Sequence, residues 1–196
     1  MKLLFNFFIM NIKFFQYASL LLIILLCSCK SEVQPKPDGY LRLEYPTADY
    51  QRADTNCTFT YLKNTQARIE EDNGCQFKIT YPFMNASIYI DYKPITNNLN
   101  YLLADAQKLT YNHTIKAESI IEQPFINPTD KVYGMFYNVT GDAATNIQFY
   151  ATDSVENFIV GTLYFYAKPN YDSIYPATKY VEKDMIRIME SIQWKK

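Results

Sequence analysis

Alternating apolar and polar residues predict β-strands in the first half of the chain. Four short runs are rich in aromatic and β-branched residues and are bounded by Pro, Asn or Gly, namely residues 40–45, 58–63, 76–81 and 87–92. In the last run, Ile88, Ile90 and Tyr92 share one face, while Tyr89 and Asp91 share the other. This alternation is typical of a strand in a sheet with two unlike faces.

The apolar period becomes helical after Pro94. Either Asn97 or Asn98 can cap a helix that we expect to run to about His113. Three strands follow at 132–140, 146–152 and 158–167, with turn residues between them, so they predict an antiparallel meander. A final helix is expected after Asp172-Ser173 and Pro176, and its apolar stripe consists of Val181, Met185, Ile188, Met189 and Ile192.

This order of strands, helix, meander and helix predicts an α+β fold. We expect an antiparallel sheet with two main helices packed on it, an order similar to that of the PsbP/Mog1-like α/β/α sandwich. No internal repeat or linker interrupts residues 40–196, which we therefore expect to form a single α+β domain.

Residues 1–28 have the pattern of a lipoprotein signal peptide. Lys2 and Lys13 precede an apolar run, residues 18–26, that is shorter than the roughly 20 residues of a membrane-spanning helix. Met10 opens a compact signal of its own and is a second candidate start. Residues 26–29, Leu-Cys-Ser-Cys, resemble a lipobox, so we expect cleavage before Cys29 and acylation of that cysteine. An ordinary cleaved signal with an incidental cysteine is the alternative.

The mature chain is acidic and rich in tyrosine. Losing Lys2 and Lys13 leaves 17 basic against 20 acidic residues, a net charge of −3, which argues against nucleic acid as a partner. Polar residues with Pro35 and Pro37 follow the cysteine, so residues 29–39 are expected to be an acylated tether.

Among the 18 tyrosines, Tyr164 and Tyr166 are spaced to share a sheet face. Such a stripe either stacks on a sugar or a partner, or simply covers the sheet.

Candidate catalytic chemistry is sparse. Cys57 and Cys75 are expected to pair as a disulfide outside the cytoplasm, with two free buried thiols as the alternative. His113 is the only histidine, so two thiols and one imidazole make a poor zinc site. Residues 70–72, Glu-Glu-Asp, are expected on a solvated turn. The sequence thus predicts neither an enzyme nor a cofactor, and favours a binding or structural role.

Two serines are candidates for modification. Asp153-Ser154-Val155 and Asp172-Ser173-Ile174 match a pattern that resembles the O-glycosylation signal of Bacteroidota envelope proteins. Both fall in predicted loops, so we expect a glycan on Ser154 or Ser173.

Several blocks along the mature chain carry a family resemblance, namely residues 35–46 (PKPDGYLRLEYP), 88–120, 132–154 and 163–176 and a closing helix ending in Trp194. Together they resemble the GldD family of gliding-motility lipoproteins of Bacteroidota, and residues 35–46 are similar to the mature N-terminus of that family. Cys57 and Cys75 also stand where the family has cysteines. The resemblance implies a lipoprotein required for gliding motility and type IX secretion, without enzymatic activity.

The resemblance also indicates which partners and location to expect. A component or assembly factor would contact other gliding and secretion envelope proteins, and we place it on the periplasmic face of the outer membrane, with the cytoplasmic membrane as alternative. A ligand-binding lipoprotein that holds a glycan or lipid is the second hypothesis. A docking strip is expected just past the tether, although an edge strand with a rigid lead-in explains it equally; it consists of Pro35, Lys36, Pro37, Gly39, Tyr40 and Arg42.

Overall fold

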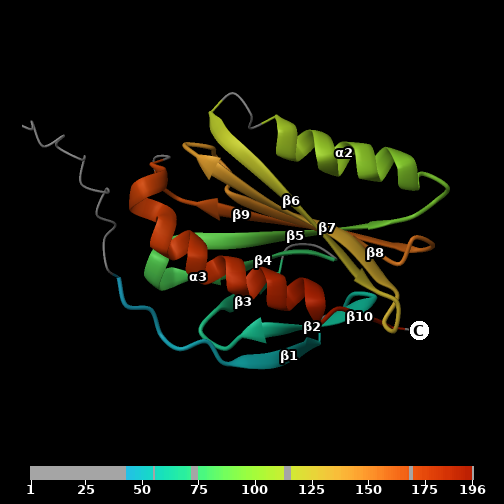
Figure 1. The fold of residues 1–196 in the computed structure, drawn as a ribbon. Coiled ribbons are helices and arrows are strands. Elements are labelled where there is room, and N and C mark those ends of the chain that lie inside the picture. Colours follow the sequence, from blue (N-terminus) through green and yellow to red (C-terminus); the bar gives the residue numbers. More distant parts are fainter. Residues whose placement is uncertain (1–42, 55, 72–74, 113–115, 168–169, 196) are drawn as a thin grey trace, which may run out of the picture. The chain divides into compact units, whose positions relative to one another are not determined.

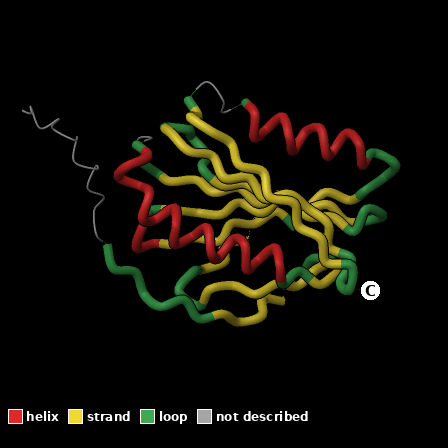
Figure 2. The backbone as a smooth tube through the Cα atoms, in the orientation of Figure 1, coloured by secondary structure: helices red, strands yellow, loops and turns green. Residues whose placement is uncertain are grey.

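The computed structural model describes residues 43–54, 56–71, 75–112, 116–167 and 170–195. These residues form the α+β fold that the sequence predicts, with a mostly antiparallel sheet and two main helices (Figures 1 and 2). The fold also contains a second, separate sheet of three strands, which the sequence did not predict.

The large sheet has seven strands, and every neighbouring pair is antiparallel. In spatial order they are β3 (Arg68–Glu71), β4 (Gln76–Tyr81), β5 (Ala86–Pro94), β9 (Asn157–Phe165), β8 (Ile147–Thr152), β7 (Val132–Gly141) and β6 (Ala117–Asn127). The small sheet consists of β1 (Tyr50–Asp54), β2 (Phe59–Asn64) and β10 (Gln193–Trp194). β7, β8 and β9 form the predicted meander.

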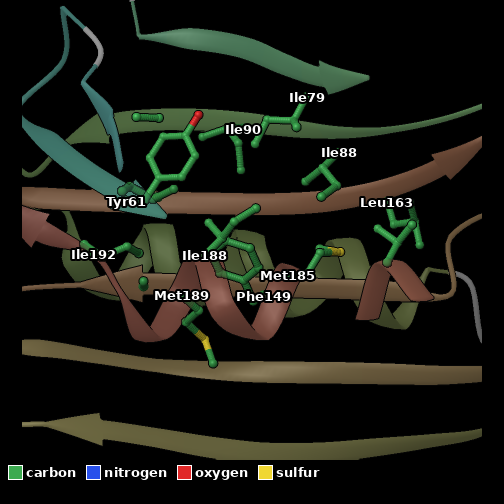
Figure 3. Close-up of a cluster of buried hydrophobic side chains, with 14 of the residues drawn as sticks. Tyr61, Ile79, Ile88, Ile90, Phe149, Leu163, Met185, Ile188, Met189 and Ile192 are labelled. Atoms are coloured by element: carbon green, nitrogen blue, oxygen red, sulfur yellow. The ribbon is translucent and has the colours of Figure 1, made fainter. Parts of the chain in front are cut away.

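Helix α3 (Tyr171–Glu190) covers the inner face of the large sheet. Its predicted apolar stripe is buried against side chains from β4, β5, β8 and β9 (Figure 3). The small sheet contributes Phe59 and Tyr61 to the same core, where the Tyr61 ring stacks on Phe77 at 5.9 Å. Both sheets and α3 therefore share one hydrophobic core.

Helix α2 (Leu99–Tyr111) lies on the other face of the large sheet. Its buried residues Leu102 and Ala106 pack on Phe158 and Val160 of β9, which alternate with the inner-facing Ile159. Because the two helices bury opposite faces, the large sheet is the middle layer (Figure 1). Asn98 occupies the N-cap position of α2, but its side chain accepts a hydrogen bond from the Thr96 N–H rather than from the helix.

The last helix begins earlier than the sequence predicts. Asn170 occupies its N-cap and accepts a hydrogen bond from the backbone N–H of Ser173. Pro176 is the sixth residue of the helix, so the Asp172 carbonyl receives no helical hydrogen bond from it. Ser173 therefore lies in the first turn of α3 and not in a loop. The helix ends at Glu190, so Trp194 belongs to β10 and not to a closing helix.

Two further expectations are wrong. Residues 43–45 form no strand; the Tyr45 ring instead packs 5.1 Å from the Tyr180 ring, which holds this segment against α3. Glu70 and Glu71 lie on β3 rather than on a turn, because the strand pairs with β4, where Lys78 forms a 2.6 Å ion pair with Glu70.

Candidate functional site

A hollow opens between α2 and the part of the outer sheet face that this helix leaves uncovered. It measures about 530 Å³, and β5, β9 and α2 supply its walls. Its lining includes Tyr89, Asp91, Lys93, Asp105, Tyr164 and Tyr166. A second hollow of about 550 Å³ shares Tyr89 and Asp91 and continues over β4 to Glu70, Gln76 and Lys78. We call the two hollows together the outer groove.

Charged side chains cross the outer groove in a connected network. Asp91 on β5 accepts a 2.6 Å hydrogen bond from the Gln76 amide of β4. Lys93 lies 3.5 Å from Asp91 and 3.2 Å from Asp105 on α2, so the network ties the helix to the sheet. Burial opposes the charge on Lys93, but the two carboxylates raise its pKa, and the ammonium stays charged at neutral pH.

Tyrosines line the outer groove beside this network. The rings of Tyr89 and Tyr164 meet edge to face, 5.4 Å apart, and the hydroxyls of Tyr89 and Tyr166 lie 2.7 Å apart. Tyr166 is 57% exposed. Hydrogen bonds with Ser87 and Tyr89, together with the nearby Lys78 charge, lower the pKa of Tyr166. These tyrosines offer ring faces and hydroxyls, which suit the recognition of a partner or ligand.

The charged groups that line the outer groove are paired with one another. Lys78 pairs with Glu70, and Lys93 lies between Asp91 and Asp105. Within the ranges that the structure describes, no three His, Cys, Asp or Glu side chains gather in a way that could hold a metal ion.

A buried carboxylate lies on the other side of the large sheet. Asp184 of α3 is only 1% exposed and accepts hydrogen bonds from the Tyr50 hydroxyl at 2.6 Å, the Tyr81 hydroxyl at 2.8 Å and the Asn64 amide at 2.8 Å. Burial first, and then Asp184, raises the pKa of both tyrosines. The three donors come from β1, β4 and β2, so Asp184 joins α3 to both sheets.

Most of the candidate site residues predicted from the sequence do not converge. Cys29, His113 and the docking strip (Pro35, Lys36, Pro37, Gly39, Tyr40 and Arg42) lie outside the described residues. Cys57 and Cys75 form a disulfide, which links the loop before β2 to the start of β4. Ser154 is exposed in the turn between β8 and β9, whereas Ser173 lies in α3.

The sequence interpretation missed most of the outer groove and all of the Asp184 network. Tyr89, Asp91 and Lys93 follow one another at every second position of β5, so their shared face was readable from the period. Asp105 could be placed only on the polar face of its helix. Asp184 lies three residues after Val181 and four before Ile188, which puts it on the buried face of α3.

The comparisons with known proteins define the class and then the family. No helix of the described ranges is long and apolar enough to cross a membrane. Residues 30–194 match a family of envelope lipoproteins, which implies a membrane-anchored location in the cell envelope. That family is the gliding motility lipoprotein GldD, and the chain belongs to it. No curated protein matches the chain.

Proposed function

We propose that this lipoprotein is a non-catalytic component or assembly factor of the gliding machinery and of the associated type IX secretion system. The observation that carries the proposal is the family match over residues 30–194, which links the chain to gliding motility. The outer groove supports a role in protein contacts, because its exposed tyrosines, Tyr89 and Tyr166, are of a residue type that is enriched at protein interfaces. Its partners would be other envelope proteins of the two systems.

The proposed location is the periplasmic face of the outer membrane. Lipid on Cys29 would hold the chain there, and residues 30–42 would join it to the described domain. An extended segment spans at most about 3 Å per residue, so the domain would work within tens of ångströms of the bilayer. This distance suits a factor that acts on membrane-bound machinery.

Deletion and complementation in the native host test the proposal. We expect a clean deletion to abolish spreading and type IX secretion together, and the wild-type chain to restore both. The His113→Ala variant should restore both as well, because the proposed role needs no general base. Normal secretion in the deletion strain would contradict the proposed role in type IX secretion.

The outer groove provides a finer test of protein contacts. We expect Tyr166→Ala to complement the deletion poorly, since it removes an exposed ring from the groove wall. Tyr101→Ala is the matched control, because Tyr101 is also highly exposed but does not line the groove. Equal complementation by the two variants would exclude the Tyr166 side of the groove as the contact surface.

Ligand binding is the second candidate function, and the tyrosine-lined groove is the observation that favours it. A bound glycan could stack on Tyr89 or Tyr166, and a lipid could lie along the apolar floor at Val160. Native mass spectrometry of protein purified from its host should then reveal a co-purifying small molecule. The added mass should be lost in the Tyr89→Ala variant.

A further inference from the structure

An aromatic cluster fixes the chain where it enters the domain. The Tyr45 ring lies 5.1 Å from the Tyr180 ring of α3 and 6.5 Å from the Phe83 ring. Phe83 and Tyr180 are themselves 6.2 Å apart. Phe83 belongs to η1 (Pro82–Met84), the short helix between β4 and β5. We call Leu43, Tyr45, Phe83 and Tyr180 the lead-in patch.

The lead-in patch leaves two large apolar side chains in solvent. Leu43 is 49% exposed, and Phe83 is 46% exposed although its ring lies near those of Tyr45 and Tyr180. Pro82, next to Phe83, is exposed as well. Leu43 is two residues from Tyr45 along the chain, so these exposed side chains belong to one end of the domain, and apolar side chains grouped in this way are typical of an interaction surface.

The aromatic surface continues from the lead-in patch around this end of the large sheet. The first turns of α3 lie there too (Figure 1), and they contribute Tyr171 and Tyr175, whose rings are 5.5 Å apart. Tyrosine rings beside exposed Leu and Phe are a composition found at membrane–water interfaces.

We propose that the lead-in patch rests on the surface of the membrane that holds the lipid anchor, with Leu43 and Phe83 in its interfacial layer. Only residues 30–42 separate Cys29 from Leu43, so the patch is the part of the described domain that the anchor holds closest along the chain. Because the tether is short, the effective concentration of the patch at the membrane surface is high, so a weak apolar contact is enough to keep the patch there. The inference depends on the lipid anchor and not on the role in motility or secretion.

Fluorescence quenching in reconstituted vesicles tests this contact. The full lipidated chain is inserted into phosphatidylcholine vesicles whose acyl chains carry bromine near the headgroup, and tryptophan emission is compared with that in unbrominated vesicles. We expect Phe83→Trp to shift its emission to shorter wavelength and to lose a larger share of it than the parent chain, whose only tryptophan is Trp194.

Ile126→Trp is the matched control. Ile126 is 71% exposed on β6, an edge strand at the opposite side of the sheet from β3, and should show no additional quenching. Equal quenching of the Phe83→Trp and Ile126→Trp chains would overturn the proposal, because it would indicate no fixed orientation. Absence of quenching from Phe83→Trp would overturn it too. If Phe83→Asp then still abolished spreading in the native host, the patch would be assigned to a protein partner.

Discussion

At the scale of single residues, Asp184 ties α3 to both sheets. A carboxylate is costly to bury, and this one has three neutral donors and no cation among its hydrogen-bond partners. Tyr50, Asn64 and Tyr81 reach it from three strands, so their hydrogen bonds specify how α3 sits against both sheets. A leucine at this position would have fitted the apolar stripe. The acid therefore fixes one arrangement of the helix rather than adding apolar burial.

The first prediction concerns Asp184→Ala. Loss of the acceptor removes the partner of the buried Tyr81 hydroxyl and of the half-buried Tyr50 hydroxyl, and one of the two partners of the Asn64 amide, so the free energy of unfolding should fall by on the order of 3 kcal/mol. Urea unfolding followed by circular dichroism measures the change. Glu190→Ala, at an exposed position of the same helix, should stay within about 0.5 kcal/mol of the wild type. Equal losses in the two variants would contradict a special role for Asp184.

The second prediction distinguishes the two candidate glycosylation sites. Ser154 is exposed, in a turn that is fixed by Asp153, whose carboxylate accepts backbone hydrogen bonds from Val155 and Glu156. Ser173 is in the first turn of α3, and its hydroxyl donates to the Asn170 carbonyl at 3.0 Å. Both serines are exposed, but the Ser173 hydroxyl is bonded to the backbone of its own helix, so we expect Ser154, in a turn, to carry the glycan.

Intact-mass measurement on protein from the native host checks this expectation. The wild-type and Ser173→Ala chains should both carry added hexose mass, and the Ser154→Ala chain should not. An unmodified wild-type chain would rule out both serines.

At the scale of elements, strands with a clear period of two were predictable and those without it were not. The predicted run at 76–81 coincides with β4, and 87–92 lies within β5. β6 was missed because it is an edge strand whose outward residues are mostly polar and exposed, and Pro124 interrupts it. Residues 40–45 alternate like a strand, yet Tyr45 finds its partners in Tyr180 and Phe83, contacts that no local pattern encodes.

The third prediction tests the packing between β8 and β9. A methyl group added at Gly161 of β9 would overlap the ring of Phe149, which is fully buried on β8. Gly161→Ala should therefore lower the free energy of unfolding by about 1–3 kcal/mol, the usual cost of overpacking a core. Urea unfolding of the purified protein gives the value.

A double-mutant cycle separates this clash from a backbone effect. In the Phe149→Leu background the smaller side chain vacates the space, so Gly161→Ala should cost less there than in the wild type. The same cost in both backgrounds would show that the ring is not the obstacle.

At the scale of the whole molecule, the family was predictable from the sequence, while the candidate site was only partly so. The family resemblance rested on blocks distributed along the mature chain, and the match over residues 30–194 confirms it. The outer groove needs α2 to leave part of the sheet uncovered, a tertiary fact that periodicity cannot supply. Sequence alone could therefore place Tyr89 and Asp91 on one face, but it could not bring Asp105 across from another element.

The fourth prediction concerns attachment of the whole molecule to its membrane. Cys29 and Cys27 are two residues apart in the lipobox-like run, but only Cys29 follows the small residue that the signal peptidase requires. Cys29→Ala should therefore abolish labelling with radioactive palmitate, since several acyl chains on one cysteine provide the stable anchor. Cys27→Ala is the matched control and should still be labelled, because alanine is also small.

The same pair of variants separates anchoring from folding. A Cys29→Ala chain should leave the membrane fraction and fail to restore spreading, yet its described domain should unfold at the same urea concentration as that of the Cys27→Ala chain, since both substitutions precede residue 43, where the described domain begins. If Cys29→Ala restored spreading while remaining unlabelled, the anchor would be dispensable, and the function would reside in the domain alone. Loss of spreading with an intact fold would instead make position at the membrane part of the mechanism.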